Sequence, residues 1–225
     1  MTEISLDDLK AALRAGCRAA LLVRHAERPK MDPNDPSFGD ALALTDEGRR
    51  TARRLGELLA DFAADAQFYA SPLTRTRMTA ALVAEGMGLA GAEIPTDGRL
   101  GNGSFYYADA SEVLEVFKPS NFFPASFEYF RTGEQRGFRN LAVATDEFER
   151  WIDATQRRRL FVIATHDLFV AAFLVARGEG GFTRENWVRF LDAGAVLTAP
   201  DGTRRYALVR TGLSTGIVGV RTPAE

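Results

Sequence analysis

Short apolar runs alternate along this chain with segments whose apolar residues recur at helical spacing. Uninterrupted runs of this kind predict buried strands, and spacings of three and four predict helices. Predicted strands cover residues 19–23, 66–70, 160–164, 195–199 and 205–209; predicted helices start at Ser5 and Thr45 and cover 71–86, 138–154 and 167–176. Such alternation predicts an α/β fold: a three-layer α/β/α sandwich with a largely parallel central sheet.

Several helix ends carry recognisable signals. Ser5, with Asp8 three residues on, resembles a capping box. Thr45 precedes two acidic residues and predicts a second N-cap. Ser71 followed by Pro72 predicts a cap and a first helical position. The helix over 167–176 is apolar on all sides, so we expect it to be buried.

Residues 96–135 show no sustained period but contain nine aromatic residues. A long irregular segment inside a compact domain is usually functional, as a lid or a binding loop. We therefore expect one domain over residues 1–225, with 96–135 as a cap-like insertion over a site. The alternative is that most of these rings fill a secondary core.

Composition narrows the function classes. A chain of 225 residues fits one domain, and its net charge of −2 gives no reason to expect nucleic acid or an anionic membrane as a partner. No apolar stretch approaches the ~20 residues of a membrane span. The single cysteine, Cys17, excludes an internal disulfide, and the polar start from Met1 to Lys10 does not resemble a signal peptide. We expect a soluble cytoplasmic protein, whose oligomeric state the sequence leaves open.

The chain has two histidines, His25 and His166, and both follow predicted strands. Ligands of α/β sheets bind outside the carboxyl ends of the strands. Each imidazole is flanked by charged residues: Arg24 and Arg28 stand around His25, and Asp167 follows His166. We therefore expect the two imidazoles to converge in one anion-binding site, because the planar fork of arginine suits phosphate oxygens.

Two further clusters lie at predicted helix starts. Ser71 to Ala80 opens a helix at a strand exit, where free backbone N–H groups favour phosphate. Its Arg75 and Arg77 are two positions apart and face different ways, so we expect at most one of them to enter a pocket. The cluster from Leu44 to Gly48 is mainly a helix start.

These clusters together resemble the histidine phosphatase superfamily, the phosphoglycerate mutase-like fold. The matching residues are Arg24-His25-Ala26-Glu27, Leu44-Thr45-x-x-Gly48, Ser71-Pro72-Leu73-x-Arg75-x-x-x-Thr79-Ala80 and Thr165-His166-Asp167. They occur in the family's order over residues 20 to 170. Each motif is weak alone, but together, in a chain with no other histidine, they are specific.

The resemblance implies a phosphatase that needs no metal and no cofactor. His25 would be the nucleophile that takes the phosphoryl group, and Arg24, Arg75 and His166 would hold the phosphate oxygens. Arg28 stands where the family's acid phosphatase branch carries another phosphate-binding arginine. Neutral imidazole keeps one lone pair for attack, and we expect a backbone carbonyl to fix the tautomer of His25 through the other nitrogen.

The chain departs from the family pattern in its general acid. The mutase branch uses a glutamate after the third strand, but residues 97–104 contain none. The acid phosphatase branch uses the aspartate after the second histidine, so we expect Asp167 to be the proton donor. Glu27 is the alternative, followed by Glu112 and Glu115 in the insertion.

Several functions stay open beside the phosphomonoesterase. A phosphohistidine protein phosphatase and a sugar-phosphate mutase use the same chemistry, and a non-catalytic module would bind phosphate without turnover. A metal site on both histidines is the poorest reading, because arginines repel a cation. The aromatic insertion favours a small phosphorylated substrate, with Lys30 and Lys118 as candidate contacts.

Overall fold

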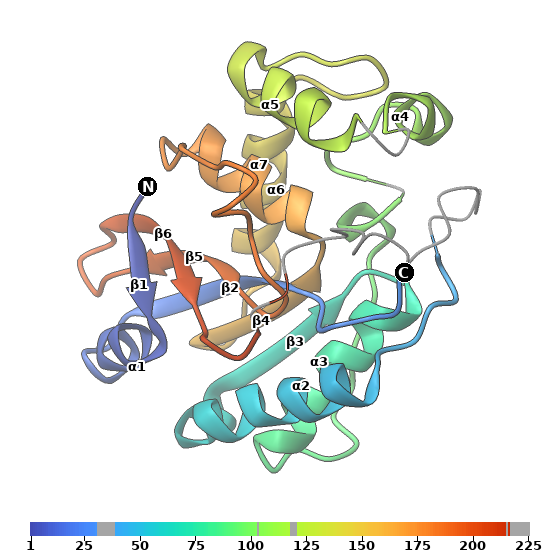
Figure 1. The fold of residues 1–225 in the computed structure, drawn as a ribbon. Coiled ribbons are helices and arrows are strands. Elements are labelled where there is room, and N and C mark those ends of the chain that lie inside the picture. Colours follow the sequence, from blue (N-terminus) through green and yellow to red (C-terminus); the bar gives the residue numbers. More distant parts are fainter. Residues whose placement is uncertain (31–38, 103, 118–120, 215, 217–225) are drawn as a thin grey trace.

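The computed structural model describes residues 1–30, 39–102, 104–117, 121–214 and 216. Within these residues a six-stranded sheet forms in the order β1-β6-β5-β2-β4-β3 (Figure 1). β5 runs antiparallel to both of its neighbours, and the other pairings are parallel. The strands are β1 (Glu3–Ser5), β2 (Arg18–Arg24), β3 (Ala66–Ala70), β4 (Leu160–Thr165), β5 (Ala193–Thr198) and β6 (Arg204–Arg210). The predicted, largely parallel sheet is confirmed.

Helices cover both faces of this sheet, which confirms the three-layer architecture (Figure 1). One face carries α1 (Leu6–Arg14), α2 (Asp46–Leu59) and α3 (Thr74–Gly86), with the 3-10 turn η1 (Ala60–Asp65) after α2. The other carries α6 (Leu141–Thr155) and α7 (Asp167–Ala176). None of the described helices combines the length and the apolar character needed to cross a bilayer.

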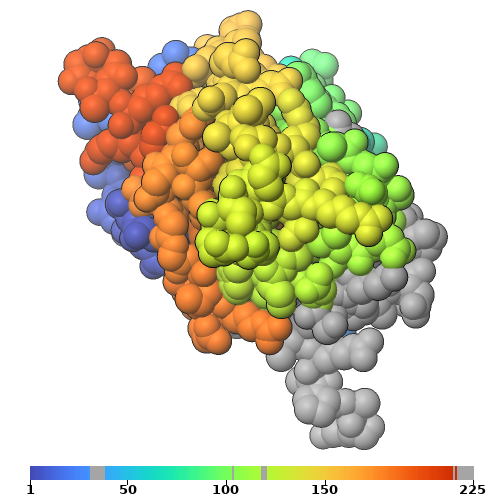
Figure 2. All heavy atoms as spheres, turned by 90° about the horizontal axis from the view of Figure 1, so that it is seen from above, coloured from blue at the N-terminus to red at the C-terminus, as the bar shows by residue number. Residues whose placement is uncertain are grey.

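The segment 96–135 forms the turn η2 (Gly98–Leu100) and the helices α4 (Ala110–Val116) and α5 (Phe122–Thr132). These helices lie beyond α7 as seen from the sheet, and α5 lies beside the segment that follows α7 (Figures 1 and 2). The rings of this segment pack against one another and against α6, α7 and Trp187. Most of these rings therefore belong to the same core cluster as α6 and α7, whereas a capping role over the site stays a prediction.

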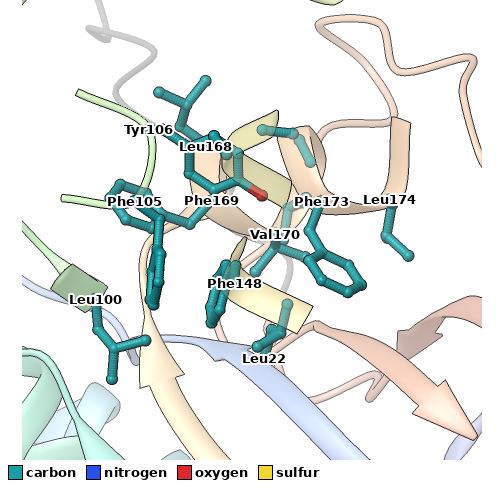
Figure 3. Packing of buried hydrophobic residues seen from close by; sticks show 14 of the residues in the cluster. Leu22, Leu100, Phe105, Tyr106, Phe148, Leu168, Phe169, Val170, Phe173 and Leu174 are labelled. Atoms are coloured by element: carbon teal, nitrogen blue, oxygen red, sulfur yellow. The ribbon is translucent and has the colours of Figure 1, made fainter. Parts of the chain in front are cut away.

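Strand alternation divides the core into two clusters. In β2, Ala20 and Leu22 face α6, α7 and the insertion, whereas Ala19, Leu21 and Val23 face α1, α2 and α3. Figure 3 shows Leu22 beneath Phe148 of α6 and Phe169 of α7. Because side chains alternate across a strand, a strand that is buried on both faces reads as a continuous apolar run.

Local signals located some helix ends and missed others. Ser5 and Thr45 cap α1 and α2 as predicted, each accepting a backbone N–H three residues on. The prediction for Ser71 is wrong: α3 begins at Thr74 after Leu73, with no side-chain cap. Helix α6 begins at Leu141, capped by Asn140, and not at residue 138. The three-residue β1 was not predicted.

Candidate active site

The two histidines converge as the sequence predicts, with ring centroids 5.6 Å apart and ring planes at 67°. Sheet register explains this approach. Arg24 at the end of β2 pairs with Thr165 at the end of the parallel β4, so the residues that follow each strand leave the sheet side by side. The backbone N–H of His25 donates to the carbonyl of Thr165 at 3.0 Å and fixes that exit.

The tautomer of His25 follows from one contact. Its Nδ1 lies 2.9 Å from the backbone carbonyl oxygen of Ala26 and so carries the proton, as predicted for a carbonyl acceptor. Nε2 then keeps its lone pair. The next peptide is held too, because the N–H of Ala26 donates to Oγ1 of Thr79 at 3.0 Å. The ring is 4 % exposed and is therefore held in one orientation.

Both imidazoles are held in the neutral form. Burial is the main cause that brings the pKa of His25 well below 6.5, and the charges of His166, Arg24 and Arg75 add to it. Burial also brings the pKa of His166 well below its usual value, with Arg75, Arg28 and Arg24 contributing. A neutral imidazole at physiological pH is a nucleophile, and a protonated one is not.

These pKa shifts predict acid destabilisation of the free protein. A histidine whose pKa is lower in the folded than in the unfolded chain contributes stability above pH ~6.5 that is lost as pH falls toward the folded pKa. We expect the free energy of unfolding to fall as the pH drops from about 6.5 to about 5, by up to about 1.4 kcal/mol per pH unit for each histidine, and the thermal unfolding midpoint to fall with it. The control is His25→Asn combined with His166→Asn; an unchanged pH slope in that variant would contradict the assignment.

Three arginines surround the imidazoles. Arg24 is 1 % exposed, donates from Nη1 to the carbonyl of Val188 at 2.6 Å and lies 4.0 Å over the ring of Phe190. Arg75, 6 % exposed, donates to the carbonyl of Gly39 at 2.8 Å, and the half-buried Arg28 donates to that of Pro29 at 2.8 Å. The site thus carries several fixed positive charges.

These guanidinium groups have few partners. The Nε atoms of Arg24, Arg28 and Arg75 are buried and make no hydrogen bond within the described part of the chain. Burial and the neighbouring Arg28 lower the pKa of Arg75 to about 10, and burial also lowers the pKa of Arg24 and of Arg28. These positive charges lie close together and have lost hydrating water on burial, and such a cluster favours an anionic ligand. Among the described residues, no three His, Cys, Asp or Glu side chains gather closely enough to hold a metal ion.

Asp167 supplies the carboxylate of this cluster. It is the first residue of α7, and its Oδ1 accepts the backbone N–H of Leu168 at 2.9 Å. Its Oδ2 accepts the indole N–H of Trp187 at 3.0 Å and lies 3.7 Å from Nη2 of Arg24. The predicted acid is therefore next to the predicted phosphate pocket, and its orientation is fixed from two sides.

The alternative acids have other partners. Glu27 accepts a 2.9 Å hydrogen bond from the hydroxyl of Thr45, which also caps α2. Gly48 makes this approach possible, because a Cβ there would lie 2.1 Å from the carbonyl oxygen of Glu27. Glu112 pairs with Arg136 at 3.4 Å, and Glu115 is exposed.

The remaining candidates lie at the surface or outside the described residues. Arg77 is exposed, which leaves Arg75 as the residue of this pair that enters the site. Lys30 is exposed as well, and Lys118 lies outside the described residues. The predictions that these lysines contact substrate stay untested.

Two groups of residues at this site were not predicted to lie there. Ser71, predicted as a helix cap, is fully buried, and its Oγ lies 3.2 Å from Nε2 of His166 and 2.7 Å from Oγ1 of Thr76. Its place directly after the predicted strand over residues 66–70 was the available signal. Trp187 and Phe190 come from a loop before β5 that has no motif, so the sequence offered no signal for them.

Comparisons with known proteins agree with this fold. The mycobacterial glucosyl-3-phosphoglycerate phosphatase is 14 % identical, with a TM-score of 0.57 over 86 % of this chain and 99 % of that one. A phosphoglycerate mutase from Bacillus anthracis is 13 % identical, with a TM-score of 0.53 over 84 % and 91 %. YhfR of Bacillus stearothermophilus is 18 % identical, with a TM-score of 0.57 over 87 % and 99 %. At these identities the likeness concerns the fold.

A search of the curated proteins finds no match. The family model of the histidine phosphatase superfamily, branch 1, matches residues 20–196, a range that contains both histidines and all the site arginines described above. The chain therefore belongs to the histidine phosphatase superfamily.

Proposed function

We propose that this protein is a metal-independent phosphatase that hydrolyses a phosphomonoester through a phosphohistidine on His25. The observation that carries the proposal is the neutral His25 imidazole, its Nδ1 held by a backbone carbonyl, beside a second imidazole and several desolvated arginines. Phosphoryl transfer asks mainly for positioning and for neutralisation of charge on the equatorial oxygens. This arrangement supplies both with protein side chains alone.

In the first step, the lone pair of His25 Nε2 attacks phosphorus while the bond from phosphorus to the leaving oxygen breaks. Arg24, Arg28 and Arg75, with His166, bind the phosphate oxygens and stabilise the transition state. The protonated carboxyl of Asp167 gives its proton to the leaving oxygen, so the product departs as an alcohol. The intermediate is phosphohistidine beside an ionised Asp167.

In the second step, water attacks the phosphohistidine from the side that the alcohol has left. Asp167, now ionised, takes a proton from this water as the new bond to phosphorus forms. The bond between phosphorus and Nε2 breaks, and its electron pair returns to the imidazole. Inorganic phosphate leaves, His25 is neutral again and Asp167 is protonated for the next cycle.

The first test is hydrolysis of p-nitrophenyl phosphate with and without a chelator. We expect turnover that the chelator does not reduce. Stoichiometric phosphate binding without turnover would instead identify a non-catalytic module, and loss of turnover with chelator would identify a metal-dependent enzyme. A panel of phosphorylated metabolites screened for released phosphate then identifies the substrate, with glucosyl-3-phosphoglycerate included because a structural relative is named for it.

Asp167→Asn tests the proton donor. An activated leaving group such as p-nitrophenolate departs without a proton, whereas a sugar alcohol needs one. We expect kcat/KM, which covers the steps up to phosphohistidine formation, to fall about 10²- to 10³-fold for an alkyl phosphate and much less for p-nitrophenyl phosphate, within the usual range for a general acid. Glu27→Gln is the matched control. An equal loss on both substrates in Asp167→Asn, or a selective loss in Glu27→Gln, would reject Asp167 as the acid.

We further propose a small phosphorylated substrate and a cytoplasmic location. The aromatic insertion supports the former, because an enzyme that acts on folded proteins needs an open approach to its phosphohistidine target. The single buried thiol of Cys17 fits a reducing compartment. A phosphohistidine protein substrate that is dephosphorylated faster than every metabolite in the panel would contradict the substrate class.

A further inference from the structure

Trp187 makes the hydrogen bond to Asp167 and has no role in the mechanism above. Its side chain is fully buried, and its indole N–H donates to Oδ2 of Asp167 at 3.0 Å. The residue comes from the irregular segment that joins α7 to β5, 20 residues after Asp167. A buried tryptophan usually finds a partner for its N–H. Here that partner is the carboxyl proposed to be the general acid and base.

The indole is clamped by aromatic rings, most of them from the insertion. Four phenylalanines of α5 and one from the loop after α7 surround it, with ring centroids 5.2 to 6.0 Å away: Phe122, Phe123, Phe127, Phe130 and Phe182. α5 lies beside the loop that contains this tryptophan (Figure 2). These five ring contacts hold the indole in one orientation, in which its N–H points toward Asp167.

The carboxyl of Asp167 faces donors and cations on the described elements around it. The N–H of Leu168 and that of Trp187 each donate to one of its oxygens. Arg24 from β2 approaches to 3.7 Å, and Arg28 and Arg75 interact with it through their charges. The phenol of Tyr107, in the insertion, is also within electrostatic reach.

We propose that Trp187 is the positioning residue for Asp167, through which the insertion orients the catalytic carboxyl. This inference rests on the function proposed above. The indole binds Oδ2 and leaves the second lone pair of Oδ1 as the site that carries the proton in the first step and receives it in the second. Loss of the indole N–H frees the carboxyl to rotate.

Trp187→Phe removes the donor and keeps an aromatic ring in the clamp. We expect kcat for an alkyl phosphate to fall roughly tenfold, with KM unchanged and p-nitrophenyl phosphate little affected. Trp151→Phe is the matched control, since this tryptophan packs in the same core against Phe105 and Phe161 and does not contact Asp167.

A double-mutant cycle separates positioning from general damage to the fold. If Trp187 acts through Asp167, Trp187→Phe causes no further loss in the Asp167→Asn background. The same tenfold loss in both backgrounds would mean a structural role and overturn the inference. If the wild-type protein hydrolyses nothing in the panel, the proposed function fails instead, and a measurement without turnover is needed for Trp187.

Fluorescence provides that measurement, because the chain has two tryptophans and Trp151→Phe leaves Trp187 as the single one. We expect Asp167→Asn, added to this variant, to shift the emission of Trp187, because the indole N–H loses its carboxylate partner, and we expect Glu27→Gln to leave the emission unchanged. An emission that Asp167→Asn leaves unchanged, or that Glu27→Gln shifts equally, would show that the indole does not sense this carboxyl and would overturn the inference.

Discussion

Replacement of His25 by alanine abolishes phosphate release, with a loss in kcat of more than about 10⁴-fold for any substrate. In the proposed route, Nε2 of His25 is the atom that forms the bond to phosphorus in the first step. The remaining arginines can bind phosphate, but they cannot replace this nucleophile. The loss is independent of the leaving group, unlike that expected for Asp167→Asn. Steady-state rates with p-nitrophenyl phosphate and with an alkyl phosphate measure it.

Two controls make the result of His25→Ala specific. The variant should still bind inorganic phosphate, since the guanidinium groups of Arg24 and Arg75 remain, and its thermal unfolding midpoint should rise with phosphate concentration. Rapid quenching of the wild-type enzyme with a labelled substrate should trap an acid-labile, base-stable phosphoryl adduct that the variant does not form. An adduct in the variant, or turnover within tenfold of wild type, would remove His25 from the nucleophile role.

The position of the reacting groups follows from local sequence pattern. An apolar run that is buried on both faces predicts a strand, and His25 and His166 each follow such a run. Neighbouring parallel strands have their carboxyl ends at the same edge of the sheet. Two histidines that each follow such a strand are therefore expected to lie close together, and their ring centroids are 5.6 Å apart. The separation of Arg75 from Arg77 likewise follows from helical geometry, since one is buried and the other exposed.

Contacts between distant segments had no such pattern. Ser71 fits the local pattern of a helix cap, but α3 starts at Thr74. The hydroxyl of Ser71 instead contacts Nε2 of His166, 95 residues later in the chain. Tertiary hydrogen bonding overrode the capping preference there. Trp187 gave no signal at all, because its role depends on α5 and α7 meeting across the irregular segment between them. Sequence pattern thus located the candidate reacting groups, whereas the residues that contact and orient them needed the structure.

Replacement of Arg75 by alanine is expected to reduce kcat/KM by about 10²- to 10³-fold, by analogy with the loss of one donor that stabilises transition-state charge. Its guanidinium is 6 % exposed, has a pKa lowered to about 10 and leaves Nε without a partner. An anion that reaches this group meets a cation that has already lost its hydration. The interaction is therefore worth more than a surface ion pair, and Arg75→Lys should recover only part of it, because a point charge replaces a bidentate fork.

Arg77 provides a matched control on the same helix, because it lies two positions after Arg75 on α3 and is exposed. Arg77→Ala removes the same net charge from the chain, so a general electrostatic attraction of substrate would weaken equally in both variants. We expect Arg77→Ala to stay within twofold of wild type, as is typical of a surface charge. Inorganic phosphate should bind more weakly to Arg75→Ala alone, and this variant should keep its thermal stability, because relief of repulsion with Arg28 offsets lost packing. A change under tenfold in Arg75→Ala, or equal losses in both variants, would mean that no arginine of α3 contacts the transferred phosphoryl group.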